Sequence, residues 1–264
     1  MDNSDNKDGK SDGRWAAIVL AAGAGKRMKS KLPKTLHPVG GRAMVLRVTD
    51  ALGRAGIGLT VLVVGHKAEL VREAVLAGAG NPAGLLFAMQ AYQLGTGDAA
   101  RTGLEVIEED HMVTDVLVLN GDMPLIQPET IAKLIGTHRE KEAGMTFLTA
   151  LLDDPFGYGR VLRDEAGNII KIVEEPDATA EQKAIREVNA GVYCFQAAFL
   201  REVLSELRPA NAQSEFYLTD TVELFNGRKR PVSSMAVADP AETMGVNDAD
   251  QLAACEKLAA RYFG

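Results

Sequence analysis

Short apolar runs alternate with helical stretches along the first half of this chain, and this alternation restricts the fold more than any other feature. Four runs are apolar without a period of two, at 16–20, 60–64, 85–89 and 116–119. Runs of this kind are typical of strands covered on both faces. The stretches between them have helical patterns, at 44–54, 67–77 and 97–107. The sequence therefore predicts a mostly parallel, doubly wound α/β sheet.

The second half of the chain has a different pattern. Residues 156–163 and 169–173 flank a glycine-containing turn and predict a hairpin, and 190–195 predicts a further strand. We expect these strands to form a smaller mixed or antiparallel layer beside the main sheet. A helix is predicted near 217–225. Asp248 and Gln251 have the spacing of a capping box, which predicts a C-terminal helix within 248–264.

Composition limits which domain organisations and which classes of protein are possible. Residues 1–13 are polar and have no apolar core of a signal peptide, so we expect a disordered tail followed by one domain over 14–264. The net charge of −7 argues against a nucleic-acid partner, and no apolar run is long enough to cross a membrane. Cys194 and Cys255 lie in apolar surroundings without a CxxC motif, which favours a cytoplasmic protein.

A glycine loop, Gly23 to Gly25, follows the first predicted strand, and such a loop lets backbone N–H groups approach phosphate oxygens. It is not a Walker phosphate loop, because Leu20 stands where a glycine is needed and Arg27 where Ser or Thr is needed. It is not a dinucleotide fingerprint, because Met28 replaces the third glycine. Two interpretations remain. One is a tight turn with solvated cations, and the other is a pair of cations, Arg27 and Lys34, held over one polyanion.

Three further segments carry residues suited to nucleotide chemistry. Asp122 follows the fourth predicted strand, where it is either a turn residue or a ligand of Mg²⁺. Asn247 offers a second oxygen from far along the chain, and it also fits a loop before the Asp248 cap. The segment from Gln90 to Asp98 joins a strand to a helix and carries an amide that can donate to and accept from a uracil edge. No covalent nucleophile is apparent, and a sugar 1-phosphate needs none.

Taken together, the residues of this chain resemble a known family, the N-terminal uridyltransferase domain of the bacterial bifunctional enzyme that makes UDP-N-acetylglucosamine. The resemblance runs from about residue 16 to the final helix. Its landmarks are the segments 20–23, 27–30, 32–34, 90–97, 121–126, 153–160, 172–174, 189–191, 211–220 and 245–247.

The resemblance implies a Rossmann-like nucleotidyltransferase domain that joins UTP to N-acetyl-α-D-glucosamine 1-phosphate and releases pyrophosphate. It implies Mg²⁺ as the cofactor, held by Asp122 and Asn247. Catalytic cations would be Arg27 and Lys34. The nucleotide would be bound by Leu20, Ala21, Ala22, Gly23, Gln90, Gly95, Thr96 and Asp122. The sugar phosphate would be bound by Gly159, Glu174 and Asn189.

Four departures from the family pattern stand out. Lys26 adds a cation to the first loop, Asp98 replaces a usual histidine, and Pro176 replaces a usual lysine. The sequence also stops at Gly264, before the repeat domain that carries acetyl transfer and trimerisation in the family, so we expect no acetyltransferase activity, a monomer and no protein partner. Glucose or N-acetylgalactosamine 1-phosphate stays open as the sugar substrate. A non-catalytic nucleotide-sugar sensor is the alternative from another class.

Overall fold

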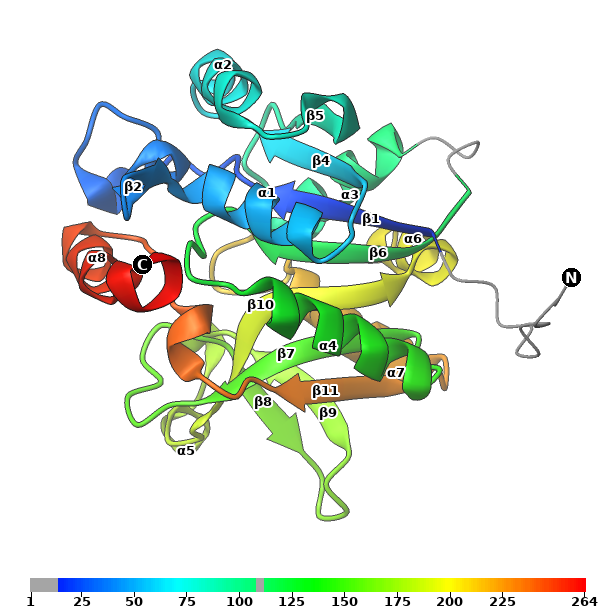
Figure 1. Ribbon diagram of the computed structural model, residues 1–264. Helices are drawn as coiled ribbons and strands as arrows, with labels where there is room; N and C mark the ends of the chain where they lie inside the picture. Colours follow the sequence, from blue (N-terminus) through cyan, green and yellow to red (C-terminus); the bar gives the residue numbers. More distant parts are fainter. Residues whose placement is uncertain (1–13, 108–111) are drawn as a thin grey trace, which may run out of the picture.

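The structure is a computed structural model that describes residues 14–107 and 112–264, and its centre is a nine-stranded sheet (Figure 1). Seven strands follow the order β11-β7-β10-β6-β1-β4-β5, and the hairpin β8–β9 is attached beside β10. These strands are β1 (Arg14–Leu20), β4 (Leu59–Val64), β5 (Leu85–Met89), β6 (Val113–Asn120), β7 (Met145–Leu151), β8 (Arg160–Arg163), β9 (Ile169–Val173), β10 (Glu187–Gln196) and β11 (Val232–Ala236). A small ribbon pairs β2 (Pro38–Val39) with β3 (Arg42–Ala43).

The first half of the chain forms the parallel part of the sheet. Strand β1 pairs in parallel with both β4 and β6, and β4 pairs in parallel with β5. The four apolar runs fall inside these four strands, so the predicted parallel sheet is confirmed. Their residues lack a period of two because both faces of the sheet are covered.

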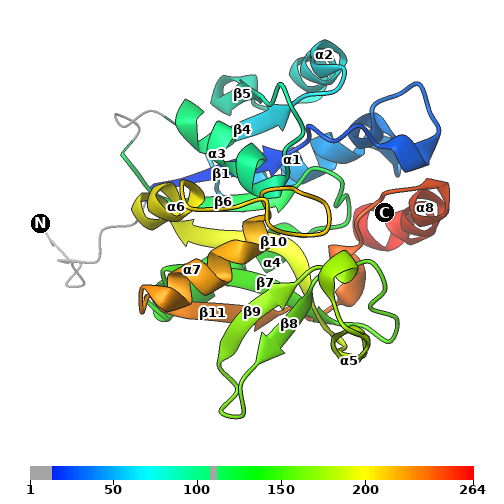
Figure 2. The same cartoon turned by 180° about the vertical axis from the view of Figure 1, so that it is seen from behind.

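Helices cover both faces of the sheet (Figures 1 and 2). They are α1 (Met44–Arg54), α2 (Ala68–Gly78), α3 (Thr96–Val106), α4 (Pro128–Glu140), α5 (Ala180–Lys183), α6 (Ala197–Leu204), α7 (Thr221–Gly227) and α8 (Ala249–Phe263). Val19 of β1 shares a core with residues of α1, α2 and α4. Its neighbour Ile18 points to the other face and shares a core with α3, α6 and α7. The predicted double winding is therefore present.

The second half differs from the prediction in one important respect. Strand β10, which we expected in a smaller layer, lies within the main sheet, where it pairs antiparallel with β6 and with β7. Only the hairpin β8–β9 stands outside, joined to β10 at Val188 and Arg160. A strand buried on both faces has no sequence signal for its direction, because the apolar run is the same whichever way it lies.

The final helix packs against the first loops rather than against the sheet. Asp248 caps α8 by accepting a hydrogen bond from the Gln251 backbone N–H at 2.9 Å, as predicted. The Gln251 side chain accepts from the Asn247 N–H at 2.7 Å, one residue before the position expected in a capping box. Cys255 and Ala259 of α8 share a small core with Met28 and Val39. Residues from opposite ends of the chain thus meet beside the sheet. None of the described helices is both long and apolar enough to span a membrane. The predicted tail, 1–13, lies outside the described residues.

Candidate active site

One edge of the sheet collects most of the polar residues that the sequence singled out. The carboxyl ends of β1, β4, β5 and β6 lie there because these strands are parallel. Strand β10 runs in the opposite direction, so its first residues lie at the same edge. Strand β11 is parallel to β7, and the chain returns to this edge after it. The edge is the usual ligand-binding side of an open α/β sheet.

Lys34, Asp122 and Asn247 meet at this edge. The Lys34 ammonium donates to an Asp122 carboxylate oxygen in direct contact, and to Asn247 Oδ1 at 3.1 Å. The Lys34 and Asp122 side chains are each 14% exposed. The Val246 N–H also donates to the Asp122 carbonyl at 3.0 Å, which fixes the segment of Asn247 beside β6. Oxygens from two distant segments therefore point at one cation.

The glycine loop holds the two predicted cations close to this edge. Gly25 has a φ of +59°, and a Cβ built on it would lie 2.7 Å from Lys34 Cβ, so the position requires glycine on both counts. The next residues form a short 3₁₀ turn, Lys26–Met28, in which Met28 is buried and Arg27 is exposed. Arg27 forms neither an ion pair nor a side-chain hydrogen bond with residues 14–107 and 112–264. Its guanidinium is therefore available to an anion.

The predicted base-binding residues form a connected set beside α3. Gln90, at the end of β5, donates from Nε2 to the Gly95 carbonyl at 3.2 Å. Thr96 begins α3, and its hydroxyl accepts from the Leu218 N–H at 3.0 Å. Phe216 donates to the Leu94 carbonyl and accepts from the Gly97 N–H. Two segments of the family landmarks are thus paired along their backbones.

The predicted sugar-binding residues lie where β10 meets the hairpin. Asn189 donates from its backbone N–H to the Gly159 carbonyl at 2.8 Å, and its side chain donates to the Tyr193 hydroxyl at 2.6 Å. Glu174 follows β9 and accepts a hydrogen bond from the Thr219 hydroxyl at 2.9 Å. A Cβ on Gly159 would lie 3.3 Å from a Glu174 carboxylate oxygen, so glycine keeps this carboxylate accessible. Burial raises the pKa of Glu174 above its ordinary value.

Many of these residues line one cleft of about 490 Å³. Eight of the predicted site residues line it, namely Leu20, Arg27, Thr96, Asp122, Gly159, Glu174, Asn189 and Asn247. The other six do not line it, namely Ala21, Ala22, Gly23, Lys34, Gln90 and Gly95. Lys34 contacts two lining residues, and the remaining five belong to the loops after β1 and β5. Gly65 lies between these loops, since a Cβ on it would be 3.0 Å from the carbonyls of both Ala22 and Gln90.

Some cleft residues received no role from the sequence. Asn120 is the last residue of β6, and Phe156 and Tyr158 belong to the turn before β8. The Phe156 side chain is 77% exposed although it borders the cleft. Burial raises the pKa of the Tyr158 phenol. Asn120 directly precedes Gly121 and Asp122, so its position at a strand end was an available signal. Phe156 and Tyr158 lie within the landmark segment 153–160, but the sequence did not show that they border the cleft, because that depends on how the β8–β9 hairpin packs.

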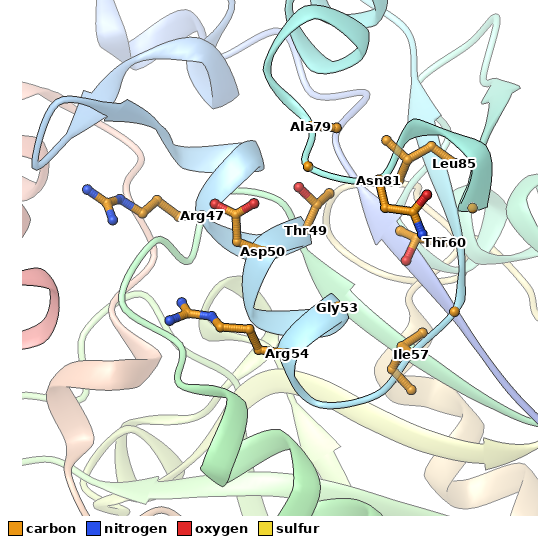
Figure 3. A pocket seen from close by; sticks show the side chains of 13 residues that line it. Arg47, Thr49, Asp50, Gly53, Arg54, Ile57, Thr60, Ala79, Asn81 and Leu85 are labelled. Atoms are coloured by element: carbon orange, nitrogen blue, oxygen red, sulfur yellow. The ribbon is translucent and has the colours of Figure 1, made fainter.

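A second hollow, of about 440 Å³, lies on another part of the molecule (Figure 3). Arg47, Asp50 and Arg54 of α1 border it, together with Thr60 and Leu85 near the amino ends of β4 and β5. It therefore lies toward the edge of the sheet opposite to the cleft. It contains none of the predicted site residues, so the cleft at the carboxyl edge is the candidate active site.

The oxygens at Lys34 suit a divalent cation. Asp122 and Asn247 supply one carboxylate and one amide oxygen, and both already approach a positive charge. Mg²⁺ binds through one or two protein oxygens and completes its shell with phosphate oxygens and water. Across residues 14–107 and 112–264, no group of three or more His, Cys, Asp or Glu side chains is placed to hold a metal.

The doubly wound sheet has a glycine loop after β1, and Asp122 and Asn247 meet the Lys34 ammonium at its carboxyl edge. This arrangement is typical of α/β proteins that bind nucleotides. The pattern of the Nucleotidyl transferase family matches residues 16–239, and the chain belongs to this family.

Relatives extend this finding over nearly the whole chain. It is 49% identical over 247 residues to the bifunctional protein GlmU of Pelotomaculum thermopropionicum, covering 93% of this chain and 52% of that protein. It is 47% identical to the bifunctional protein GlmU of Geobacter metallireducens, a match that covers 94% of this chain and 51% of that protein. It is 41% identical to the bifunctional protein GlmU of Clostridioides difficile, and that match covers 94% of this chain and 52% of that protein. The chain thus spans about half the length of these relatives.

A solved structure shares the fold. The crystal structure of a putative glucose-1-phosphate thymidylyltransferase from Bacillus anthracis, in complex with a sucrose, superposes with a TM-score of 0.71. It is 20% identical in sequence, and the match covers 93% of this chain and 95% of the other. The Rossmann-like nucleotidyltransferase fold expected from the sequence is confirmed.

Proposed function

We propose that this chain is a Mg²⁺-dependent uridylyltransferase that converts UTP and N-acetyl-α-D-glucosamine 1-phosphate to UDP-N-acetylglucosamine and pyrophosphate. The observation that carries the proposal is the convergence of Lys34, Asp122 and Asn247 at the wall of the cleft that Arg27 borders. Two cations and two metal-type oxygens then face one polyanion. The similarity to bifunctional GlmU proteins over more than nine-tenths of the chain supports the choice of substrates.

The chemistry requires alignment and charge neutralisation. A phosphate oxygen of the sugar 1-phosphate attacks the α-phosphorus of UTP, and the bond from that phosphorus to the bridging oxygen of pyrophosphate breaks. Arg27 and Lys34 bind the triphosphate and neutralise the charge that grows on the leaving pyrophosphate. No general base is needed, because the attacking oxygen is already anionic.

Asp122 and Asn247 would hold the Mg²⁺ ion. Bound there, the ion supplies positive charge that polarises the phosphoryl oxygens. The Lys34 ammonium contacts both of these oxygens. We therefore assign Lys34 a second role, which is to balance the charge of the Asp122 carboxylate.

Glu174, Asn189 and Gly159 are proposed to bind the sugar phosphate. Glu174 follows β9, Asn189 lies in β10 and Gly159 directly precedes β8, and all three residues line the cleft. The carboxylate and the amide can accept from and donate to sugar hydroxyl and acetamido groups. We propose that the reaction takes place in the cytosol, in keeping with the two free and buried thiols of Cys194 and Cys255.

The test is a pyrophosphate-release assay with UTP, Mg²⁺ and a panel of sugar 1-phosphates. The panel contains N-acetylglucosamine, glucose and N-acetylgalactosamine 1-phosphate. We expect N-acetylglucosamine 1-phosphate to give the highest kcat/KM. A higher value for another sugar would correct the substrate. Tight UDP-sugar binding without turnover in either direction would refute the proposal in favour of a nucleotide-sugar sensor.

A further inference from the structure

The side-chain amide of Gln90 is held by a residue outside the sites described so far. Gln90 is 4% exposed, and its Nε2 donates to the Gly95 carbonyl at 3.2 Å and to Asp98 Oδ2 at 2.8 Å. Asp98 lies in the first turn of α3 and is 7% exposed. The contact between Gln90 and Asp98 is thus buried and joins the end of β5 to the beginning of α3.

These two contacts determine which way the amide faces. A backbone carbonyl and a carboxylate are both acceptors, and only the NH₂ end of an amide can donate to them. Rotating the amide by half a turn would place Oε1 against two oxygens in a buried position. The orientation therefore follows from the chemistry of the partners. Both Nε2 hydrogens are used within the protein, and Oε1 is the end left to meet a ligand.

A second contact, through Oδ1, holds the Asp98 carboxylate in place. Oδ1 accepts from the Arg101 guanidinium, so each carboxylate oxygen has its own partner. The Arg101 guanidinium lies 5.8 Å from the centre of the Phe216 ring. Phe216 is in turn bound along its backbone to Leu94 and Gly97. The orientation of Gln90 is thus tied to the whole loop between β5 and α3.

We propose that Asp98 is a positioning residue for nucleobase selection. By holding Nε2, Asp98 presents Gln90 Oε1 as a fixed acceptor to the pairing edge of the base. This inference rests on the proposed function and on the nucleotide-binding role that the sequence predicts for Gln90. Uracil and thymine carry an N–H at position 3 that can donate to this oxygen. Cytosine carries a lone pair at the same position, which Oε1 repels. The site therefore favours bases with an N–H donor at position 3.

The experiment compares UTP and CTP binding by titration calorimetry for the wild type, Asp98→Ala and Asp98→Asn, each checked by thermal unfolding. We expect the wild type to bind UTP more tightly than CTP. Asp98→Ala frees the amide to rotate, so the ratio of the two dissociation constants should fall about tenfold, the change that one lost buried hydrogen bond gives. Asp98→Asn retains an oxygen that can accept from Nε2, and it should stay within about twofold of the wild-type ratio.

Turnover gives a second measurement that separates this inference from the proposed function. In Asp98→Ala the KM for UTP should rise while kcat at saturation changes little, because the phosphate contacts are intact. Equal wild-type binding of UTP and CTP, an unchanged ratio in Asp98→Ala, or an equal loss in Asp98→Asn would each overturn the inference. Preferential UTP binding without pyrophosphate release would instead refute the proposed uridylyltransferase activity. The ratio of UTP to CTP dissociation constants in the variants would still test the positioning role of Asp98.

Discussion

Lys34 and Asp122 lie 88 residues apart in the chain, and the ammonium of the first donates directly to the carboxylate of the second. Asn247, which lies 213 residues after Lys34 in the chain, accepts from the same ammonium at 3.1 Å. Three segments of the chain therefore meet at the Lys34 ammonium. Since a metal ion and the Lys34 ammonium would compete for the same oxygens, this contact predicts that Lys34 affects metal binding.

Removing Lys34 should strengthen metal binding in the absence of nucleotide. In Lys34→Ala, the Asp122 carboxylate loses the cation that balances it, so we expect the Mg²⁺ dissociation constant of the free protein to fall about tenfold, equivalent to about 1.4 kcal/mol. Calorimetric titration with Mg²⁺ alone measures this. Asp122→Ala is the matched variant, and it should weaken the same binding. An unchanged constant in Lys34→Ala would show that the ammonium does not compete with the metal.

Removing Arg27 should abolish most turnover without unfolding the protein. Its exposed guanidinium borders the cleft, and losing one preorganised charge contact of this kind costs about 10²–10³-fold in kcat. Pyrophosphate release from UTP measures the effect. Lys26→Ala is the control, because Lys26 is an exposed cation of the same 3₁₀ turn that does not border the cleft. Equal activity losses in the two variants would assign the effect to general surface charge.

Gly25→Ala should disturb the site through Lys34. The new Cβ would lie 2.7 Å from Lys34 Cβ, and the backbone would be strained at a φ of +59°. We expect a loss of about 1–2 kcal/mol of stability and a fall in kcat of at least about tenfold. Gly41→Ala is the matched control, since its φ is +75° with no atom within 4 Å. Gly41→Ala should lose similar stability and keep its activity. Full activity in both variants would show that the close approach of residue 25 to Lys34 does not matter for turnover.

Asp220 should make the protein less stable as the pH rises. Burial, followed by the charges of Glu223 and Asp177, raises the pKa of Asp220 from 3.8 to about 6. The folded protein thus holds this proton more tightly than the unfolded chain does. The stability that the proton contributes is fully present below about pH 3.8, and it is lost as the pH rises through about 6.

Asp220→Asn should therefore be more stable than the wild type at pH 7. The gain should be about 1 kcal/mol, since the partly exposed carboxyl is screened by solvent, and it should vanish near pH 4. Urea unfolding of both proteins from pH 4 to pH 8 measures the difference. Glu223→Gln removes one of the charges that raise this pKa, and it should shift the midpoint of the pH dependence downward. A difference independent of pH would exclude Asp220 as its source.

The local sequence determined the elements of the parallel half. The apolar runs predicted β5 over Leu85–Met89 and α1 over Met44–Arg54 with the bounds that the structure has. The apolar run of β5 and the helical pattern of α1 each lie within their own segment, and the Asp248 cap of α8 depends on residues three positions apart. The segments α4, β7, α6 and β11 were not predicted. Strand β11, with the sequence VSSMA, is held in the sheet by its pairing with β7 more than by its own apolarity.

Only the tertiary structure brought the site residues together. Glycine loops, a strand-end aspartate and a distant asparagine could each be identified along the chain, and their contacts could not. The meeting of Lys34, Asp122 and Asn247 depends on the order of the strands, on the reversed direction of β10 and on the return of the chain after β11. The orientation of Gln90 likewise depends on Asp98 and Gly95 closing around it. Periodicity reports which face of an element is buried, whereas contacts between elements follow from packing across the whole sheet.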